Sequence, residues 1–366
     1  MEKIVKVLHT EWSDGWGGQE IRIINEMIAV RKLGVDVFLA CREHAMIKHK
    51  AIEHNIKVFS MPFKGNADFK TLFEIRRVVK EYNIDIVNTH SGKDTWVGGL
   101  AAKLSDAKFI RTRHLSNRIR SSRTNFINEL ADYIFTTGEG VKADMIKYNR
   151  IKSEVIESIP TGIDTNLFCS KKYNKDECRK QFHLKKSEIV IGIVAVLRQF
   201  KRHDLFIEMA KQLIGKYPDK KLKFLIAGDG PGREKIKKLI LDYKLSDNVV
   251  MLGYLEHVPE LLSALDIFVL SSDSKEGVPQ SVMQALFMGK PVVATNSGST
   301  KDLLNINSNN FQLVGTDSSL ELVKGASNYI DNDKINMVGP LIDEKFSLNL
   351  MSKKIVNIYN KLLIEH

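Results

Sequence analysis

The stretch EGVPQSVMQALFMGKPVVAT, residues 276–295, decides the fold. Pro279 suits the first turn of a helix and Gly289 suits the end of one, so the stretch predicts a helix between them. An apolar run, residues 267–270, precedes this helix, and a second run, residues 291–295, follows it. A strand, a helix and a second strand in this order form a βαβ unit with parallel strands.

The same alternation extends over the whole chain. Between the apolar runs, apolar residues recur at helical spacing, as at Ile21, Ile24 and Ile28, and a glycine such as Gly34 then ends the helix. Such alternation predicts parallel sheets with both faces covered by helices. The expected strands are 4–8, 35–40, 56–60, 84–88, 107–110, 133–135, 155–159, 189–197, 222–227, 249–252, 267–270 and 291–295.

The alternation falters in one place, a polar stretch with a single short helical candidate between Thr161 and Lys186. We therefore predict an α/β protein of two Rossmann-like, doubly wound domains, residues 1–165 and 188–345, joined by a linker of residues 166–187. The amphipathic segment 346–366 is expected to pack back on the first domain. Ligands of open parallel sheets bind beyond the carboxyl ends of the strands, so two facing sheets would place a site in an interdomain cleft.

The composition is that of a globular protein, with 43% apolar and 27% charged residues among 366. No run approaches 18 consecutive apolar residues, and the first nine residues are too charged for a signal peptide. Three cysteines without a CxxC pair argue against a disulfide framework or a zinc ribbon. We therefore expect a cytoplasmic protein, with a peripheral contact at the inner face of the cytoplasmic membrane as an option.

The net charge of +11 is shared by both halves of the chain, but one segment is especially basic. From Lys103 to Arg123 there are seven basic residues and one acidic residue. No helix-turn-helix, RNP or zinc-finger pattern accompanies them, so we expect no nucleic-acid partner. Anionic lipid headgroups, a phosphorylated substrate and a plain solvated face each remain compatible with this charge.

Glu276 stands just before the predicted helix of the quoted stretch. Free N–H groups at a helix start favour anions, so the start of this helix suits the phosphate or hydroxyl oxygens of a phosphorylated sugar. We assign Gly277, Val278 and Pro279 to this donor site. The Glu276 carboxylate would accept hydrogen bonds from sugar hydroxyls. An acidic residue that simply caps the helix is the alternative interpretation of the same spacing.

The quoted stretch resembles the signature of the retaining GT-B glycosyltransferases of family four, E-G-x-P-x-x-x-x-E-A-x-x-x-G-x-P-V-V. The resemblance implies a GT-B fold and a contact between Glu276 and the transferred sugar. The second glutamate of the signature, which holds the nucleotide ribose in the family, is Gln284 in this chain. An amide can still bond a ribose hydroxyl, both as acceptor and as donor.

Further motifs match in the same order, nearly end to end. In the first domain, Gly17 and Gly18 stand where the family has a G-G-x-E loop near the donor phosphates. Residues 85–91 match the end of the family's fourth strand, and His114 matches a histidine near the reacting sugar. On the acceptor side we assign four polar residues of this domain, Asp14, Ser91, Arg113 and Arg118.

In the second half, residues 159–168 resemble the family's hinge motif, and the loops containing Gly230 and Tyr254 resemble those that flank the nucleotide. The family pattern G-R-L-x-x-x-K falls on residues 195–201, where Lys201 matches and Val196 replaces the arginine. Arg198 is the candidate substitute. Cations at this place stabilise the charge that grows on a departing nucleoside diphosphate. Two merely exposed loop cations are the alternative.

Together these matches imply a retaining, metal-independent glycosyltransferase with Glu276, His114, Arg198 and Lys201 as its catalytic residues. The donor would be a UDP- or GDP-linked sugar, the acceptor a glycan or lipid-linked hydroxyl in bacterial lipopolysaccharide or capsule biosynthesis, and no cofactor is expected. Two alternatives remain open. A sugar-nucleotide epimerase shares the architecture, and a degenerate nucleotide-binding relative would explain the departures at Gln284 and Val196.

Overall fold

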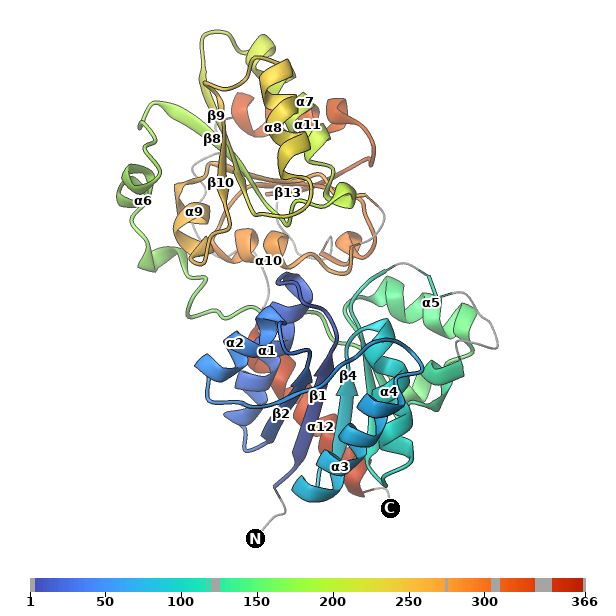
Figure 1. Ribbon diagram of the computed structural model, residues 1–366. Coiled ribbons are helices and arrows are strands. Elements are labelled where there is room, and N and C mark those ends of the chain that lie inside the picture. The colour runs from blue at the N-terminus through green and yellow to red at the C-terminus, as the bar shows by residue number, and fades with distance from the viewer. Residues whose placement is uncertain are drawn as a thin grey trace. The chain divides into compact units, whose positions relative to one another are not determined.

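The computed structural model describes residues 4–116, 118–119, 126–273, 276–303, 310–332 and 344–364. The chain forms two compact units, each a parallel sheet covered by helices (Figure 1). Unit 1 comprises Met1–Gly162 and Lys345–His366, and unit 2 comprises Ile163–Glu344. None of the helices in the described ranges is long and apolar enough to cross a membrane.

Unit 1 has a sheet in the order β3-β2-β1-β4-β5-β6-β7, and every described strand pair is parallel. The order reverses between β1 and β4, the kind of place where ligands of doubly wound sheets bind. The strands are β1 (Lys6–Glu11), β2 (Asp36–Cys41), β3 (Lys57–Ser60), β4 (Ile86–Thr89), β5 (Lys108–Arg113), β6 (Tyr133–Thr136) and β7 (Ile156–Ser158). The helices are α1 (Gly18–Arg31), α2 (Met46–Glu53), α3 (Phe69–Tyr82), α4 (Gly92–Lys103), α5 (Glu139–Asn149) and α12 (Leu348–Ile364).

Unit 2 has a parallel sheet in the order β10-β9-β8-β11-β12-β13, which reverses between β8 and β11. Its strands are β8 (Glu188–Val194), β9 (Lys221–Ala227), β10 (Val249–Gly253), β11 (Ile267–Leu270), β12 (Val292–Thr295) and β13 (Phe311–Val314). Its helices are α6 (Lys175–Gln181), α7 (His203–Lys216), α8 (Arg233–Asp242), α9 (Val258–Ala264), α10 (Gln280–Phe287) and α11 (Ser319–Asp331).

Each of the twelve predicted strands overlaps a strand of the structure. β11 and β12 have the sequences IFVL and VVAT, and every residue in both is buried. Inner strands of a covered parallel sheet are apolar along their whole length, which makes them easy to recognise. The sequence does not predict β13, because this edge strand buries only Phe311 fully and has Gln312 in its middle.

Helix α12 packs against α1 in unit 1 and places Met351, Ile355 and Tyr359 in the core of that unit. The chain leaves unit 1 after Gly162 and returns to it at Lys345. Gly162 lies beside Leu348, the first residue of α12. A Cβ atom on Gly162 would lie 2.5 Å from the Cα of Leu348, so only glycine permits this close approach. The residue is therefore required where the two ends of unit 1 meet.

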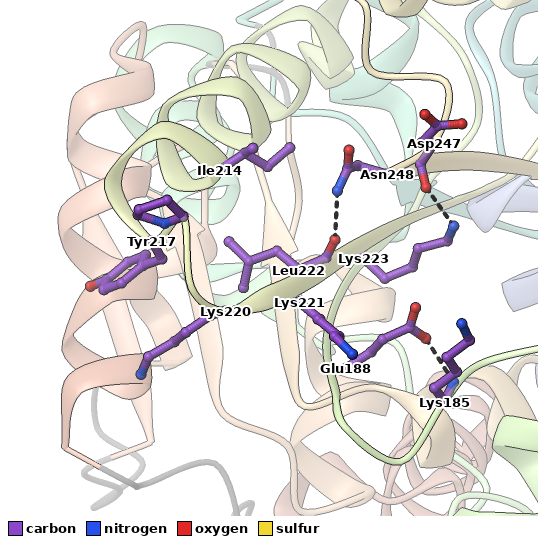
Figure 2. Close-up of a pocket in the computed structure, with 11 residues that line it drawn as sticks. Lys185, Glu188, Ile214, Tyr217, Lys220, Lys221, Leu222, Lys223, Asp247 and Asn248 are labelled. Carbon is purple, nitrogen blue, oxygen red and sulfur yellow. Dashed lines mark hydrogen bonds between the residues drawn. The ribbon is translucent and has the colours of Figure 1, made fainter.

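The amino ends of β8 and β9 border a cavity of about 350 Å³ in unit 2 (Figure 2). Lysines from several segments line it, together with Glu188 and Asp247. Lys223 Nζ donates a hydrogen bond to the carbonyl of Asp247 at 2.7 Å. Because ligands of parallel sheets bind at the opposite, carboxyl ends of the strands, this cavity is separate from the site described below.

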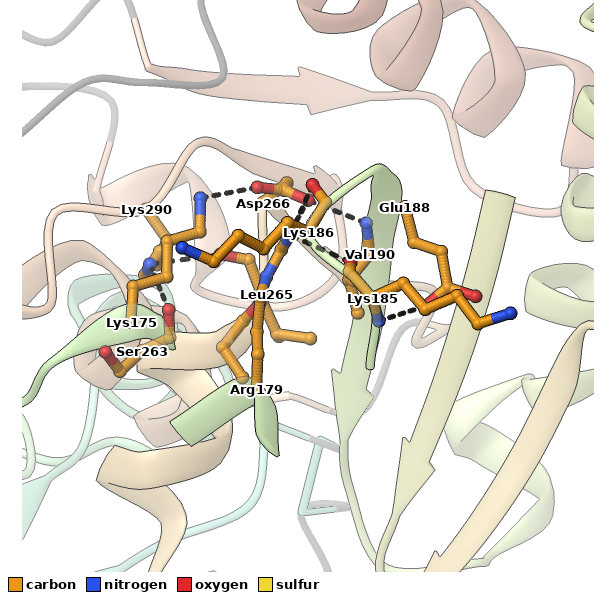
Figure 3. Close-up of polar contacts among 11 residues, drawn as sticks. Lys175, Arg179, Lys185, Lys186, Glu188, Val190, Ser263, Leu265, Asp266 and Lys290 are labelled. Atoms are coloured by element: carbon orange, nitrogen blue, oxygen red, sulfur yellow. Dashed lines mark hydrogen bonds and ion pairs between the residues drawn. The ribbon is translucent and has the colours of Figure 1, made fainter. Parts of the chain in front are cut away.

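The prediction of a linker at residues 166–187 is wrong, because this segment belongs to unit 2. Helix α6 packs on α9, and Asp266 pairs with both Lys175 (Nζ to Oδ1, 2.6 Å) and Arg179 (Figure 3). Lys290 Nζ donates to the carbonyls of Ser263 and Leu265 at 2.8 and 3.0 Å. Two cations of this stretch, Lys175 and Arg179, therefore pair with a buried carboxylate, which sequence polarity alone does not distinguish from a solvated linker.

Candidate functional site

The carboxyl edge of the unit 2 sheet carries the charged residues predicted for the donor. The loop after β8 contains Arg198 and Lys201, and the loop after β11 contains Glu276. Because the strand order reverses between β8 and β11, these two loops flank the place where ligands of doubly wound sheets bind.

Lys201 and Glu276 form an ion pair between Nζ and Oε1. Their side chains are only 13% and 10% exposed, so water screens the pair little. Two hydrogen bonds to main-chain carbonyls hold the loops together: Ser271 Oγ donates to the Lys201 carbonyl at 2.9 Å, and the N–H of Asp273 donates to the Phe200 carbonyl at 2.8 Å. The cation and the carboxylate are thus held in register by the main chain.

The structure does not support Glu276 as a simple helix cap. Helix α10 has Pro279 as its N-cap residue, and no side chain caps it. The N–H groups of its first turn therefore have no side-chain acceptor among the described residues, as an anion site at a helix start requires. Of the other residues predicted here, two are buried and two half-buried, namely Val278, Pro279, Gly277 and Gln284.

Unpaired polar atoms gather around this ion pair. Ser272 Oγ follows β11, Ser299 Oγ follows β12, and both are buried without a hydrogen-bond partner in the described part of the chain. Asp273 Oδ1 is also buried without a hydrogen-bond partner among the described residues. The N–H of Ser299 donates to the carbonyl of Glu276 at 3.1 Å, which places β12's loop at the same edge. Leaving such a group unpaired costs about 1–3 kcal/mol, so these atoms mark a place for a polar ligand.

A glycine-rich loop after β9 borders the same edge. A Cβ atom on Gly228 would lie 2.0 Å from the carbonyl oxygen of Ala195, and its φ of +139° disfavours other residues. The N–H of Gly228 donates to the Gly253 carbonyl at 2.7 Å, next to the half-exposed Tyr254. The structure thereby brings the predicted loops of Gly230 and Tyr254 together.

Arg198 lies at the surface of the loop after β8. Its side chain is exposed and has no ion-pair partner in the described ranges. The N–H of Leu197 donates to the Asp229 carbonyl at 3.0 Å, which holds this loop against the glycine-rich one. Arg202, four residues on, already pairs with Asp204 and Asp317. Arg198 is therefore available to a ligand.

In unit 1, Gly17 and Ser91 begin the helices that follow β1 and β4. The N–H of Gly17 donates to Glu20 Oε2 at 2.9 Å, and Gly18 is the first residue of α1. Asp94 accepts from the N–H of Ser91 at 2.8 Å and from Thr10 Oγ1 at 2.7 Å. Asp94 thus ties the two strands together at the point where their order reverses.

Glu11, at the end of β1, is a site residue that the sequence analysis missed. Burial, together with the nearby carboxyl groups of Asp94 and Glu20, raises its pKa to about 8. The group is therefore largely protonated at neutral pH. It accepts a hydrogen bond from the N–H of Ser13 at 2.8 Å and a second from Gln19. The pattern TEWSDGWGG offers no signal for this, because burial decides it.

His114 follows β5, and His90 lies beside it. His90 Nδ1 and His114 Nε2 share a hydrogen bond at 3.0 Å, and His9 Nδ1 shares one with His90 Nε2 at 2.9 Å. Burial, with Arg22 and Arg111 nearby, holds the pKa of His90 and His114 well below the usual value. The histidine predicted for the site is therefore neutral. No spacing in the sequence connects this histidine to His9 or His90.

The four residues predicted for the acceptor side contact different elements. Asp14 pairs with Arg42 at 2.7 Å, and Arg118 pairs with Asp144 of α5 at 3.1 Å. Ser91 and Arg113 lie at the ends of β4 and β5, and burial lowers the pKa of Arg113 to about 9. Arg113 directly precedes His114, and Ser91 directly follows His90, whose ring is hydrogen-bonded to His114. The other two basic residues after Arg113, Arg120 and Arg123, are outside the described residues.

Two family models match this chain, one for each unit. The model described as Glycosyltransferase Family 4 matches residues 16–167, and the model described as Glycosyl transferases group 1 matches residues 174–337. The first match covers most of unit 1 but not β1 and α12, and the second lies within unit 2.

Individual proteins are similar over nearly the whole length. An Escherichia coli enzyme named UDP-Gal:alpha-D-GlcNAc-diphosphoundecaprenol alpha-1,3-galactosyltransferase is 26% identical, over 97% of this chain and 93% of its own. A glycosyltransferase from Rickettsia africae superimposes with a TM-score of 0.86 at 22% identity, over 98% of this chain and 99% of its own. HepE from Anabaena, solved with UDP and glucose, superimposes with a TM-score of 0.82 at 19% identity, over 98% and 100%. The likeness covers both units.

Proposed function

We propose that this chain, which belongs to the group 1 glycosyltransferases with the GT-B fold, transfers a sugar with retention of configuration and without a metal ion. The sugar moves from a nucleotide-sugar donor to a glycan or lipid-linked acceptor. The observation that carries the proposal is the shielded Lys201–Glu276 pair between β8 and β11. The epimerase alternative is not favoured, because the matching families and relatives are transferases.

Unit 2 binds the donor in this proposal. Lys201 and the exposed Arg198 supply positive charge to the diphosphate, and the second carboxylate oxygen of Glu276 accepts from a sugar hydroxyl. The unpaired hydroxyls of Ser272 and Ser299 offer further hydrogen bonds to the same ligand. Cations that are already in place at a developing negative charge contribute about 10²–10³ in rate each.

The reaction breaks the bond between the anomeric carbon and the diphosphate oxygen and forms a bond to the acceptor oxygen on the same face of the sugar. The electron pair of the broken bond stays on the diphosphate, where Lys201 and Arg198 stabilise it. The acceptor hydroxyl gives its proton to a phosphate oxygen of the donor. No protein base is needed, which agrees with the low pKa of His114.

The donor is proposed to be a UDP-sugar and the acceptor a lipid-linked sugar of bacterial surface polysaccharide. The name of the E. coli relative states a UDP-sugar donor and a diphosphoundecaprenol acceptor, and the Anabaena structure holds UDP. The basic segment from Lys103 to Arg123 suits the phosphates of such an acceptor and of an anionic membrane. Unit 1 would then bind the acceptor through the loops after β1, β4 and β5.

The donor proposal is tested first by nucleotide binding. The melting temperature is measured with UDP, GDP, ADP, CMP or NAD, each with magnesium or with EDTA. A ligand at 100 times its Kd adds about 2.7 kcal/mol, enough to raise Tm by several degrees. We expect a shift with UDP that is the same with and without magnesium. A shift with NAD alone, or one that EDTA abolishes, would contradict the proposal.

Transfer itself is tested with radiolabelled UDP-galactose, UDP-glucose and UDP-N-acetylglucosamine and a short-chain lipid diphosphate bearing N-acetylglucosamine. The anomeric proton coupling of the product, measured by NMR, reports whether configuration is retained. Formation of an α-linked product from an α-linked donor is expected. Conversion of the donor sugar without any acceptor would instead indicate an epimerase, and UDP binding without turnover would indicate a degenerate relative.

A further inference from the structure

Three histidines form a line across neighbouring strands of unit 1. His9 lies in β1, His90 directly follows β4 and His114 directly follows β5, and these three strands are adjacent in the sheet. His9 is the register partner of Asn88, and Thr89 is the partner of Arg111. Each histidine therefore stands two positions closer to the carboxyl edge than the one before. Their exposed fractions are 0%, 1% and 9%.

Hydrogen bonds connect the three histidine rings in sequence. The two bonds, His9 Nδ1 to His90 Nε2 and His90 Nδ1 to His114 Nε2, are 2.9 and 3.0 Å long. The rings of His9 and His90 are stacked with centroids 5.2 Å apart, and those of His90 and His114 lie 5.3 Å apart. Both nitrogens of the middle ring are thus engaged, and only His114 Nδ1 is left at the end nearest the surface.

All three rings are neutral. Burial lowers the pKa of His9 to about 3, and burial with positive charge from α1 and β5, namely Arg22, Arg111 and Arg113, keeps the other two low. A neutral imidazole has one N–H donor and one acceptor nitrogen. Every hydrogen bond in the line must therefore point the same way, and only two arrangements exist.

The buried end of the line selects between these arrangements. His9 Nε2 is buried and has no hydrogen-bond partner within the described residues. Buried N–H groups that lack an acceptor are rare in folded proteins, so a bare lone pair on His9 Nε2 is more favourable there than an unpaired N–H. His9 then donates to His90, and His90 donates to His114.

We propose that His9 and His90 are positioning residues that hold His114 in the tautomer with its hydrogen on Nδ1. His114 then meets its ligand only as a hydrogen-bond donor and selects an acceptor oxygen, such as a sugar hydroxyl oxygen that keeps its own proton for another partner. It cannot serve as the base for the acceptor hydroxyl. The identity of the ligand rests on the proposed function, whereas the tautomer does not.

The tautomer is measured without any substrate. The full chain is labelled with ¹⁵N-histidine, and long-range ¹H–¹⁵N spectra are recorded from pH 5.5 to 8, with rings assigned through single substitutions. Protonated and bare ring nitrogens differ strongly in chemical shift. We expect His9, His90 and His114 to carry the hydrogen on Nδ1 and not to titrate. A hydrogen on Nε2 of His114, or titration of any of the three in this range, would overturn the proposal.

Variants then test whether the line acts on His114 from a distance. His9→Phe keeps a ring but removes the donor, so His114 should become a mixture of tautomers, with kcat/KM for the donor reduced about 2- to 10-fold, the equivalent of one weakened hydrogen bond. His9→Asn places an amide N–H near the position of Nδ1 and should restore the tautomer. His203→Phe, a change at a buried histidine of unit 2, is the matched control and should leave the His114 signals unchanged.

The two readouts separate the possible failures. If His9→Phe does not fold, the wild-type spectra still test the tautomer directly. If no transfer activity is found with any donor, the spectra alone decide the proposal. Unchanged His114 tautomer in folded His9→Phe would contradict it.

Discussion

The carboxyl edges of the two sheets differ in the charge of their buried groups. In unit 2, Lys201 and Glu276 keep opposite charges together with little exposure to water, and Arg198 adds an exposed cation. In unit 1, burial keeps two groups uncharged: Glu11 holds its proton, and the imidazole of His114 is neutral. An ion pair with an exposed cation suits a leaving diphosphate, whereas uncharged hydrogen-bonding groups suit sugar hydroxyls. Two sheets of similar topology therefore offer different chemistry to a ligand.

The largest effect is expected from removing charge in unit 2. Glu276→Ala should reduce kcat by about 10²–10³ at saturating UDP-sugar, because the sugar contact is lost and Lys201 is left unpaired. Lys201→Ala should act similarly. Glu321→Ala, which breaks an exposed pair with Lys324 in the same unit, is the control and should leave kcat unchanged. Full turnover by Glu276→Ala would refute the role assigned to the carboxylate.

A second test changes the backbone of the glycine-rich loop after β9 in unit 2 and leaves the charged side chains in place. Gly228→Ala would place a Cβ against the Ala195 carbonyl at a positive φ, so a loss of about 1–3 kcal/mol in the free energy of unfolding and weaker UDP binding are expected. Gly215→Ala in α7 has open space around it and should stabilise the protein by about 0.5–1 kcal/mol. Denaturant unfolding and UDP titration check both. If both variants have the same free energy of unfolding and the same affinity for UDP, the glycine-rich loop can accommodate a Cβ atom at position 228.

The neutral edge of unit 1 predicts a pH dependence. The pKa of Glu11 is higher in the folded than in the unfolded chain, so the folded state binds more protons and the free energy of unfolding falls as pH rises from about 5 to 8. Glu11→Gln is neutral throughout and should raise Tm by a few degrees at pH 8.5 but change it little at pH 5. Thermal melts at both values test this. A larger gain at the lower pH would mean that Glu11 is ionised in the folded protein.

The smallest effect is expected at the basic surface of unit 1. Arg118 is exposed and pairs with Asp144, so Arg118→Ala should change stability by less than about 1 kcal/mol. If this segment contacts an anionic membrane, the variant should also weaken binding to phosphatidylglycerol vesicles by about 1 kcal/mol per cation at low salt. Lys324→Ala in unit 2 is the control. If Arg118→Ala and Lys324→Ala bind vesicles equally well, Arg118 does not contact the membrane.

Sequence patterns were sufficient wherever one local interaction dominated. Continuous apolar runs such as β11 and β12 identified the inner strands, and Pro279 and Gly289 placed the ends of α10 within a residue or two. The order of the motifs around Glu276 identified the family. Patterns failed for β13, an edge strand with a polar residue, and for residues 166–187, where Lys175 and Arg179 pair with Asp266.

The sequence by itself determined the class of fold, the family and the presence of a cation and a carboxylate in the loops after β8 and β11, because apolar periodicity and short motifs are local properties of the chain. Only the tertiary structure decided that Lys201 meets Glu276, that Glu11 keeps its proton and that His9, His90 and His114 form one line. The hydrogen bond between His9 and His90, for example, joins residues 81 positions apart. Their charge states follow from burial, which no local pattern of residues specifies.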